Sequence, residues 1–128
     1  MLYIDIAGNG PRKTCRGVIE WFKSQYLPRH HLEISIHYRG LKRDGVMGWC
    51  MVEGQICRPR SFLIEIQSGL NEEDHLKTLF HELWHVYQHI KGTLSETEAE
   101  TMEEVLYDNF LTHRTKLSYC PPKLACRV

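Results

Sequence analysis

Apolar and polar residues alternate along several short stretches in the first half of the chain. The stretch LYIDIA is followed by the turn sequence GNGP. In the later stretch LEISIHYRG the apolar side chains fall at every second position: Leu32, Ile34, Ile36 and Tyr38. Glycines separate it from two more such stretches, WCMVE and SFLIEIQS. Because successive side chains of a strand point to opposite faces, we expect a small, mainly antiparallel sheet of three or four strands.

Two segments show the spacing of amphipathic helices. Between Pro11, which suits a first helical turn, and Pro28, which stops the helix, apolar residues recur at helical spacing: Cys15, Val18, Ile19, Phe22 and Tyr26. After Asn71, a favourable N-cap, three acidic residues occupy the first turn. An apolar stripe follows: Leu76, Leu79, Phe80, Leu83, Tyr87 and Ile90. Gly92 predicts the end of this second helix.

A third helix is predicted soon after that glycine. Ser95 followed by Glu98 forms a capping-box pattern, and the helical segment extends to about Thr112. Residues 113–128 contain Pro121 and Pro122 and are predicted to form a surface tail. With 128 residues, the chain has the length of one domain, and its mixture of helices and strands predicts the α+β class.

The composition narrows the range of environments and partners. The 16 acidic residues balance the 16 basic residues, so net charge provides no long-range attraction to nucleic acid or anionic lipid. No stretch has the roughly 20 apolar residues that cross a bilayer, and the N-terminus does not have the pattern of a secretory signal. The five cysteines are scattered and odd in number, which favours reduced thiols. We therefore expect a soluble cytoplasmic protein without a membrane partner.

The sequence HELWH at residues 81–85 places two histidines one helical turn apart. His81 and His85 lie within about 40° of each other around the helix and nearly opposite the apolar stripe. Two imidazoles in this arrangement can bind one zinc ion, and Glu82 can reach a metal-bound water as a general base. The alternative is that all three residues are solvated on an exposed helix face. The amphipathic helix and the acidic helix after it favour the metal site.

A hydrolytic zinc site usually has three protein ligands and keeps a fourth position for water. The candidates for the third ligand are His89, Glu96, Glu98, Glu100 and Glu103. His89 lies about 12 Å along the axis from His81, too far to share the ion, and Glu98 is needed for the helix cap. Glu96 and Glu100 remain, and Glu100 is equally well explained as a partner of a ligand histidine or as a solvated residue. For Glu103 we favour the interpretation that it is one of the negative charges that stabilise the N-terminal part of the helix.

The sequences HELWHVYQ and ETEAE resemble the minimal zinc peptidases of the gluzincin type, which are small one-domain relatives of the SprT-like proteins. The resemblance covers about residues 60–105 and implies a zincin-like metallopeptidase domain over residues 1–128. It implies one Zn²⁺ per chain, with His81, His85 and Glu96 as ligands and Glu82 as the general base. Gln88 matches an extension of the motif, and Ala99 is the small residue expected where two helices approach.

The chain also departs from the SprT-like pattern. SprT-like proteins proper use a third histidine after the motif and often add a zinc ribbon with paired CxxC sequences. Here Cys50 and Cys57 are too far apart in sequence for that pairing, as are Cys120 and Cys126. We therefore expect these cysteines to be buried or idle thiols rather than ligands of a second zinc ion.

These features predict a zinc peptidase that hydrolyses a peptide or protein substrate. We expect SFLIEIQS to be a core strand and also a sheet edge to which an extended substrate adds as a strand, and Trp84 to pack in the core. Five basic residues are expected to be solvated rather than to contact nucleic acid: Arg39, Lys42, Arg43, Arg58 and Arg60. The alternative is a catalytically silent protein that keeps the zinc fold for a structural or interaction role in a larger assembly.

Overall fold

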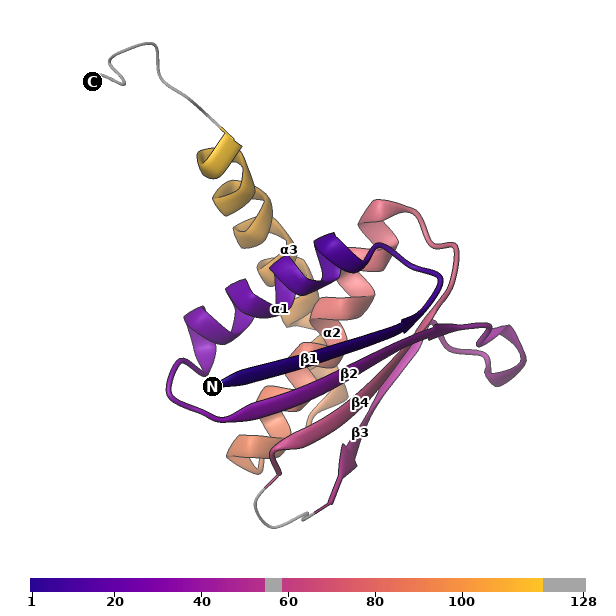
Figure 1. Ribbon diagram of the computed structural model, residues 1–128, viewed down its shortest axis with the longest axis horizontal. Coiled ribbons are helices and arrows are strands. Elements are labelled where there is room, and N and C mark those ends of the chain that lie inside the picture. The colour runs from indigo at the N-terminus through magenta and orange to yellow at the C-terminus, as the bar shows by residue number, and fades with distance from the viewer. Residues whose placement is uncertain (55–58, 119–128) are drawn as a thin grey trace.

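The computed structural model describes residues 1–54 and 59–118 (Figure 1). Within these residues four strands form one sheet: β1 (Leu2–Gly8), β2 (Leu32–Arg39), β3 (Gly48–Glu53) and β4 (Ser61–Gln67). The same residues form the helices α1 (Arg12–Tyr26), α2 (Glu72–Lys91) and α3 (Glu96–Ser118), with a short 3-10 helix at Lys42–Asp44. The class is α+β, as the sequence predicts.

The sheet is mixed, so the prediction of a mainly antiparallel sheet is wrong. The strands lie in the order β1-β2-β4-β3, as Figure 1 shows. Strand β2 is parallel to both β1 and β4, whereas β3 is antiparallel to β4. Helix α1 connects β1 to β2, and a helical crossover of this kind returns the chain in its original direction. The alternation of residues identifies the buried face of a strand but does not identify its neighbours.

Strand β4 lies inside the sheet, between β2 and β3. Its side chains Phe62, Ile64 and Ile66 are fully buried, which confirms the core role predicted for SFLIEIQS. The prediction that this segment forms a sheet edge is wrong, because β4 is paired on both sides. Among the described strands the edges are β1 and β3, and β3 packs beside α2.

The hydrophobic core contains the side chains that the alternating and helical patterns select. Strand β2 contributes four buried residues, Leu32, Ile34, Ile36 and Tyr38, and α2 contributes Leu76, Leu79, Phe80 and Leu83. Burial of each large apolar side chain stabilises the fold by about 1.5 to 3 kcal/mol before the entropy of ordering the chain is counted. Trp84 is 7% exposed and contacts the rings of Phe22 and Tyr26, which confirms its predicted place in the core.

The ends of α2 follow the local sequence signals. Asn71 Oδ1 accepts a hydrogen bond from the Asp74 backbone N–H at 2.8 Å, which satisfies one of the free donors of the first turn. At the other end Gly92 has φ of 76°, a left-handed conformation that glycine adopts without the steric penalty of a Cβ. These two caps fix the length of α2 and allow the chain to turn directly into α3.

Helix α3 continues to Ser118, beyond the predicted end at Thr112. The first part of the predicted tail, residues 113–118, is therefore helical, and Arg114 in this part pairs with Glu72 on α2 at 3.2 Å. The remaining tail residues, 119–128, lie outside the described residues. In the described part of the chain, no helix combines the length and apolar character that crossing a membrane requires.

Candidate metal centre

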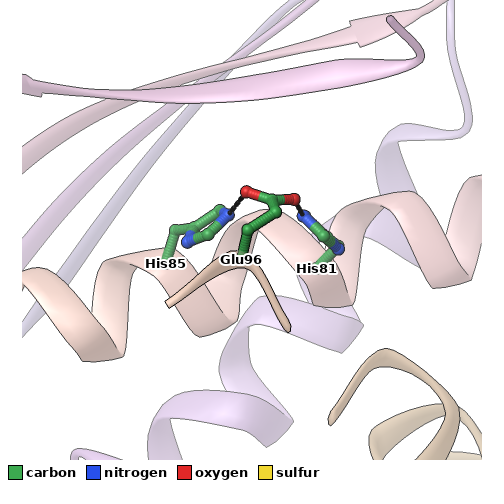
Figure 2. A group of neighbouring side chains, drawn as sticks. All are labelled: His81, His85 and Glu96. Atoms are coloured by element: carbon green, nitrogen blue, oxygen red, sulfur yellow. Dashed lines mark hydrogen bonds and ion pairs between the residues drawn. The ribbon is translucent and has the colours of Figure 1, made fainter. Parts of the chain in front are cut away.

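The candidate site lies where α2 and the first turn of α3 meet. His81 and His85 are one turn apart on α2, and the turn at Gly92 brings Glu96, the first residue of α3, back beside them (Figure 2). Ser95 Oγ accepts a hydrogen bond from the Glu98 backbone N–H at 3.1 Å, so this first turn is capped as predicted. Ala99, one turn further along α3, is fully buried. Helix α3 packs against α2.

The three side chains converge on one another. Glu96 Oε1 lies 2.5 Å from His81 Nε2, and Glu96 Oε2 lies 3.1 Å from His85 Nε2, as the dashed lines in Figure 2 mark. One ligand atom from each residue lies within 4.8 Å of the other two. The histidine side chains are each 15% exposed, whereas the Glu96 side chain is 66% exposed. The structure thus brings together two imidazole nitrogens and a carboxylate, with the carboxylate on the solvent side.

Glu103 holds the second ring nitrogen of His81. Its Oε1 lies 2.8 Å from His81 Nδ1, so both nitrogens of this imidazole face carboxylate oxygens. Burial lowers the pKa of His81, but the hydrogen bond with Glu103 and the charges of Glu82 and Glu96 outweigh burial and raise the pKa overall. The role of Glu103 as mere helix-start charge is therefore wrong, because this carboxylate fixes the ring of His81.

Gln88 holds the second ring nitrogen of His85. Its Nε2 donates to the Ser95 carbonyl at 2.9 Å and to Glu98 Oε1 at 2.9 Å, which leaves Gln88 Oε1 to accept from His85 Nδ1 at 2.8 Å. The amide is completely buried, so its orientation is set by these three contacts. Nδ1 of His85 is therefore the donor nitrogen, and Nε2 is the nitrogen available to a metal ion.

Glu98 has a role that the sequence did not reveal. Its side chain accepts from Trp84 Nε1 at 2.8 Å as well as from Gln88, and the hydrogen bond from Gln88, followed by that from Trp84, lowers its pKa. The capping box predicts only the contact between its backbone and Ser95. The signal that could have revealed this role is the buried Gln88, since a buried amide needs fixed partners on both its oxygen and its nitrogen.

Two of the earlier candidates lie outside the donor group. Glu100 borders a hollow next to His81 and is not among the residues that converge at the imidazoles. His89 packs against the ring of Phe62, with centroids 6.0 Å apart, and does not belong to the converging group. Of the two glutamates left open by the sequence, the structure therefore places Glu96 at the histidines.

Glu82 points into the space beside the two histidines. It is 5% exposed, and burial, aided by the charges of Glu96 and Glu103 and opposed by His81, raises its pKa to about 7. None of the hydrogen bonds between the described residues involves its carboxylate, which borders the space beside the histidines. A carboxylate with a pKa near neutrality can both accept and return a proton, as a general base must.

Two adjoining hollows lie between α2, the start of α3 and the edge strand β3. The larger, of about 390 Å³, is bordered by the three converging side chains and Glu82 on one side and by residues 46 and 48–50 on the other. Gly48 allows this close approach of strand and helix, because a Cβ there would lie 2.8 Å from Thr78 Cγ2 and 3.0 Å from the Glu65 carbonyl oxygen. The site thus borders a cavity whose far wall is formed by residues of β3 and of the segment before it.

The donor set fits a zinc ion. Imidazole nitrogen and carboxylate oxygen are ligands that zinc accepts, with bonds of about 2.0 to 2.1 Å. Both histidines direct Nε2 at the common point while Nδ1 is held by Glu103 or Gln88, the arrangement in which a partner fixes a ligand imidazole. The hydrogen bonds between Glu96 and the two Nε2 atoms mark the positions at which an ion would replace the intervening proton.

The structure also describes some of the arginines and cysteines that were considered in the sequence. Arg39 forms two hydrogen bonds to Glu65, at 2.8 and 2.9 Å, so its charge is neutralised on the sheet. Cys50 is a free thiol that borders the larger hollow, and Cys15 is a free thiol in the core. The other cysteines, at positions 57, 120 and 126, and the arginine at position 58 lie outside the described residues.

The chain matched no protein-family model, no curated protein sequence and no solved structure when it was compared with each of these sets. What can be said of this chain therefore rests on its own fold and site. They describe an α+β protein in which two histidines of one helix and a glutamate of the next converge beside a buried carboxylate.

Proposed function

We propose that this protein is a zinc-dependent peptidase with one Zn²⁺ per chain, bound by His81, His85 and Glu96. The observation that carries the proposal is the combination of this donor group with Glu82, a nearly buried carboxylate that lines the same cavity. A structural zinc site is usually closed by four protein ligands, whereas this site has three and opens into a cavity. The combination therefore supports a hydrolytic site over a structural one.

The proposed chemistry divides between the metal and the chain. When bound, zinc supplies a Lewis acid that polarises the scissile carbonyl and lowers the pKa of water. Glu82 takes a proton from the attacking water and later passes it to the leaving amine, a role for which its position in the same cavity is suited. Glu103 and Gln88 keep the two imidazoles oriented, so that the geometry does not have to be assembled during the reaction.

The edge strand β3 is the proposed docking strand for an extended substrate. One side of β3 pairs with β4, and the backbone groups on its other side are not paired with any described strand. Residues 48–50 of this strand border the cavity that contains the donor group and Glu82. A peptide added along β3 by main-chain hydrogen bonds would pass in front of Glu82, and this replaces the role first expected of SFLIEIQS.

Metal content tests the first half of the proposal. Protein purified without added metal or an affinity tag, and the same protein after titration with zinc, would be analysed by elemental mass spectrometry. We expect about one zinc per chain. Glu96→Ala should lose or weaken binding, and the matched variant Glu100→Ala should retain it. A parent protein that takes up no zinc would rule out the proposed function.

Peptide cleavage tests the second half. Zinc-loaded protein and its Glu82→Gln variant would be incubated with a mixed peptide library, and new termini would be identified by mass spectrometry. We expect the variant to keep its zinc and to lose about 10² to 10⁴-fold in rate, the usual contribution of a general base. Full zinc loading with no cleavage by the parent would instead favour a catalytically silent protein that keeps the zinc fold.

A further inference from the structure

A second, smaller hollow adjoins the cavity of the metal centre. It has a volume of about 230 Å³ and shares Val46, Gly48, His81 and Glu82 with the larger cavity. Its separate part is bordered by Met47 and Thr78 and, from α3, by Glu100 and Glu103. A substrate that lies along β3 in front of Glu82 therefore has this hollow within reach of the side chain next to the reacting bond.

The walls of the hollow are apolar and its α3 side is acidic. Val46 and Met47 are 37% and 52% exposed, so their apolar surfaces are open to a ligand. Glu100 and Glu103 supply two carboxylates, and among the described residues no lysine or arginine borders the hollow. A side chain with an aliphatic stem and a positively charged end therefore complements the apolar wall and the acidic side of the hollow.

The carboxylates of the hollow differ in whether they already have a hydrogen-bond partner. Glu103 is held by His81 Nδ1 at 2.8 Å. Glu100 forms no hydrogen bond or ion pair with any described residue, and Glu82 is 5% exposed and likewise unpartnered. A bound zinc ion would not cancel the negative charge around the hollow, because Glu96, Glu100 and Glu103 alone exceed its two positive charges. The hollow thus has a net negative charge in either state.

We propose that this hollow, with Glu100 at its α3 side, selects substrates that have a lysine or arginine beside the cleaved bond. The proposal rests on the proposed peptidase function and adds its substrate class. The stem of the basic side chain packs between Val46 and Met47, and its cationic group lies at Glu100. Thr78 and Gly48 form the floor where α2 and β3 meet.

Binding of short peptides tests the proposal without requiring cleavage. Two series of blocked peptides would be used, in which the residue before or after the central bond is lysine, arginine, norleucine or glutamate. Dissociation constants would be measured by NMR titration with the Glu82→Gln protein in the presence of one equivalent of zinc. In one of the two series we expect lysine and arginine to bind about fivefold more tightly than norleucine, because an ion pair with the exposed Glu100 contributes at most about 1 kcal/mol.

Two further variants identify the carboxylate that is responsible. Adding Glu100→Gln should reduce the preference for lysine at least threefold, whereas the matched change Glu104→Gln should leave it unchanged, because Glu104 pairs with Lys77 instead. High salt should also weaken the preference, since exposed charges are screened. Equal binding of lysine and norleucine peptides in both series, or a preference unaffected by Glu100→Gln, would overturn the proposal.

The same peptides separate this proposal from the proposed function. Zinc-loaded parent protein would be tested for cleavage of both series. A lysine preference in binding without any cleavage would retain the acidic pocket that binds a cation and reject the peptidase. Cleavage that is equally fast for norleucine and lysine, with equal binding, would retain the peptidase and reject the pocket.

Discussion

Replacing Glu82 by glutamine should stabilise the metal-free protein. Glu82 is 5% exposed, no described residue donates a hydrogen bond to it, and its pKa rises from an ordinary 4.5 to about 7. One pKa unit corresponds to about 1.4 kcal/mol, so an ionised Glu82 destabilises the fold by about 3 kcal/mol at alkaline pH. Glutamine has nearly the same shape and carries no charge, so the variant avoids this destabilisation.

The sign of the effect depends on pH in a defined way. Below pH 4.5 the carboxyl group is protonated in the folded and the unfolded chain, so parent and variant should be about equally stable. Between pH 4.5 and about 7 the unfolded chain releases the proton and the folded chain keeps it, so the parent loses stability as the pH rises. The advantage of the variant should therefore grow through this window and level off above it.

Urea unfolding in the presence of a chelator measures this difference. The free energy of unfolding would be compared for the parent, Glu82→Gln and the control Glu104→Gln at several pH values across the window. The control changes a carboxylate of α3 that is exposed and pairs with Lys77, so its effect should stay within about 0.5 kcal/mol at each pH. If the difference in free energy of unfolding between parent and Glu82→Gln does not change with pH, the conclusion that burial disfavours the ionised form of Glu82 is refuted.

Three further predictions concern the surroundings of the site and the core. Gln88→Leu should weaken zinc binding by about 10 to 100-fold in a competition titration with a chelating dye, because His85 then loses the partner that orients it; unchanged affinity would contradict that role. Gly48→Ala should lower the free energy of unfolding by about 1 to 3 kcal/mol, since its Cβ would press on Thr78, whereas Gly17→Ala, which meets open space in α1, should raise it by about 0.5 to 1 kcal/mol. Burial, partly offset by the charge of Glu72, lowers the pKa of His75. The stability that His75 contributes is therefore present above pH 6.5 and is lost as the pH falls. His75→Gln should reduce this loss of stability at acidic pH, as measured by urea unfolding at several pH values.

The helix that carries the histidines could be predicted from the sequence because its signals are local. Asn71 and Gly92 determine its ends through their own backbone groups, and the stripe containing Leu76 and Leu83 determines its buried face. The strands could be located for the same reason. Their order could not, because a residue pattern with a period of two is equally compatible with a parallel and an antiparallel neighbour.

The roles of the acidic residues depended on how two helices pack. Glu96, Glu100 and Glu103 share one face of α3, so helical geometry alone gives each of them access to α2. Packing around buried Ala99 then separates them: Glu96 reaches Nε2 of both histidines, Glu103 reaches Nδ1 of His81, and Glu100 borders the neighbouring hollow. The second nitrogen of a ligand imidazole needs a partner, which could have suggested Glu103 for this role. The same argument could not have decided between Glu100 and Glu103.

The instability expected of Glu82 bears on the choice between an enzyme and a structural zinc protein. A carboxylate that is 95% buried without a partner opposes folding, and a neutral glutamine at this position would serve packing better. A structural site would gain nothing from such a group, because Glu82 is not among the residues that would hold the ion. A hydrolytic site requires it, since the proton of the attacking water must be accepted beside the metal. A variant that is more stable, equally loaded with zinc and inactive would therefore separate the two proposals by stability as well as by rate.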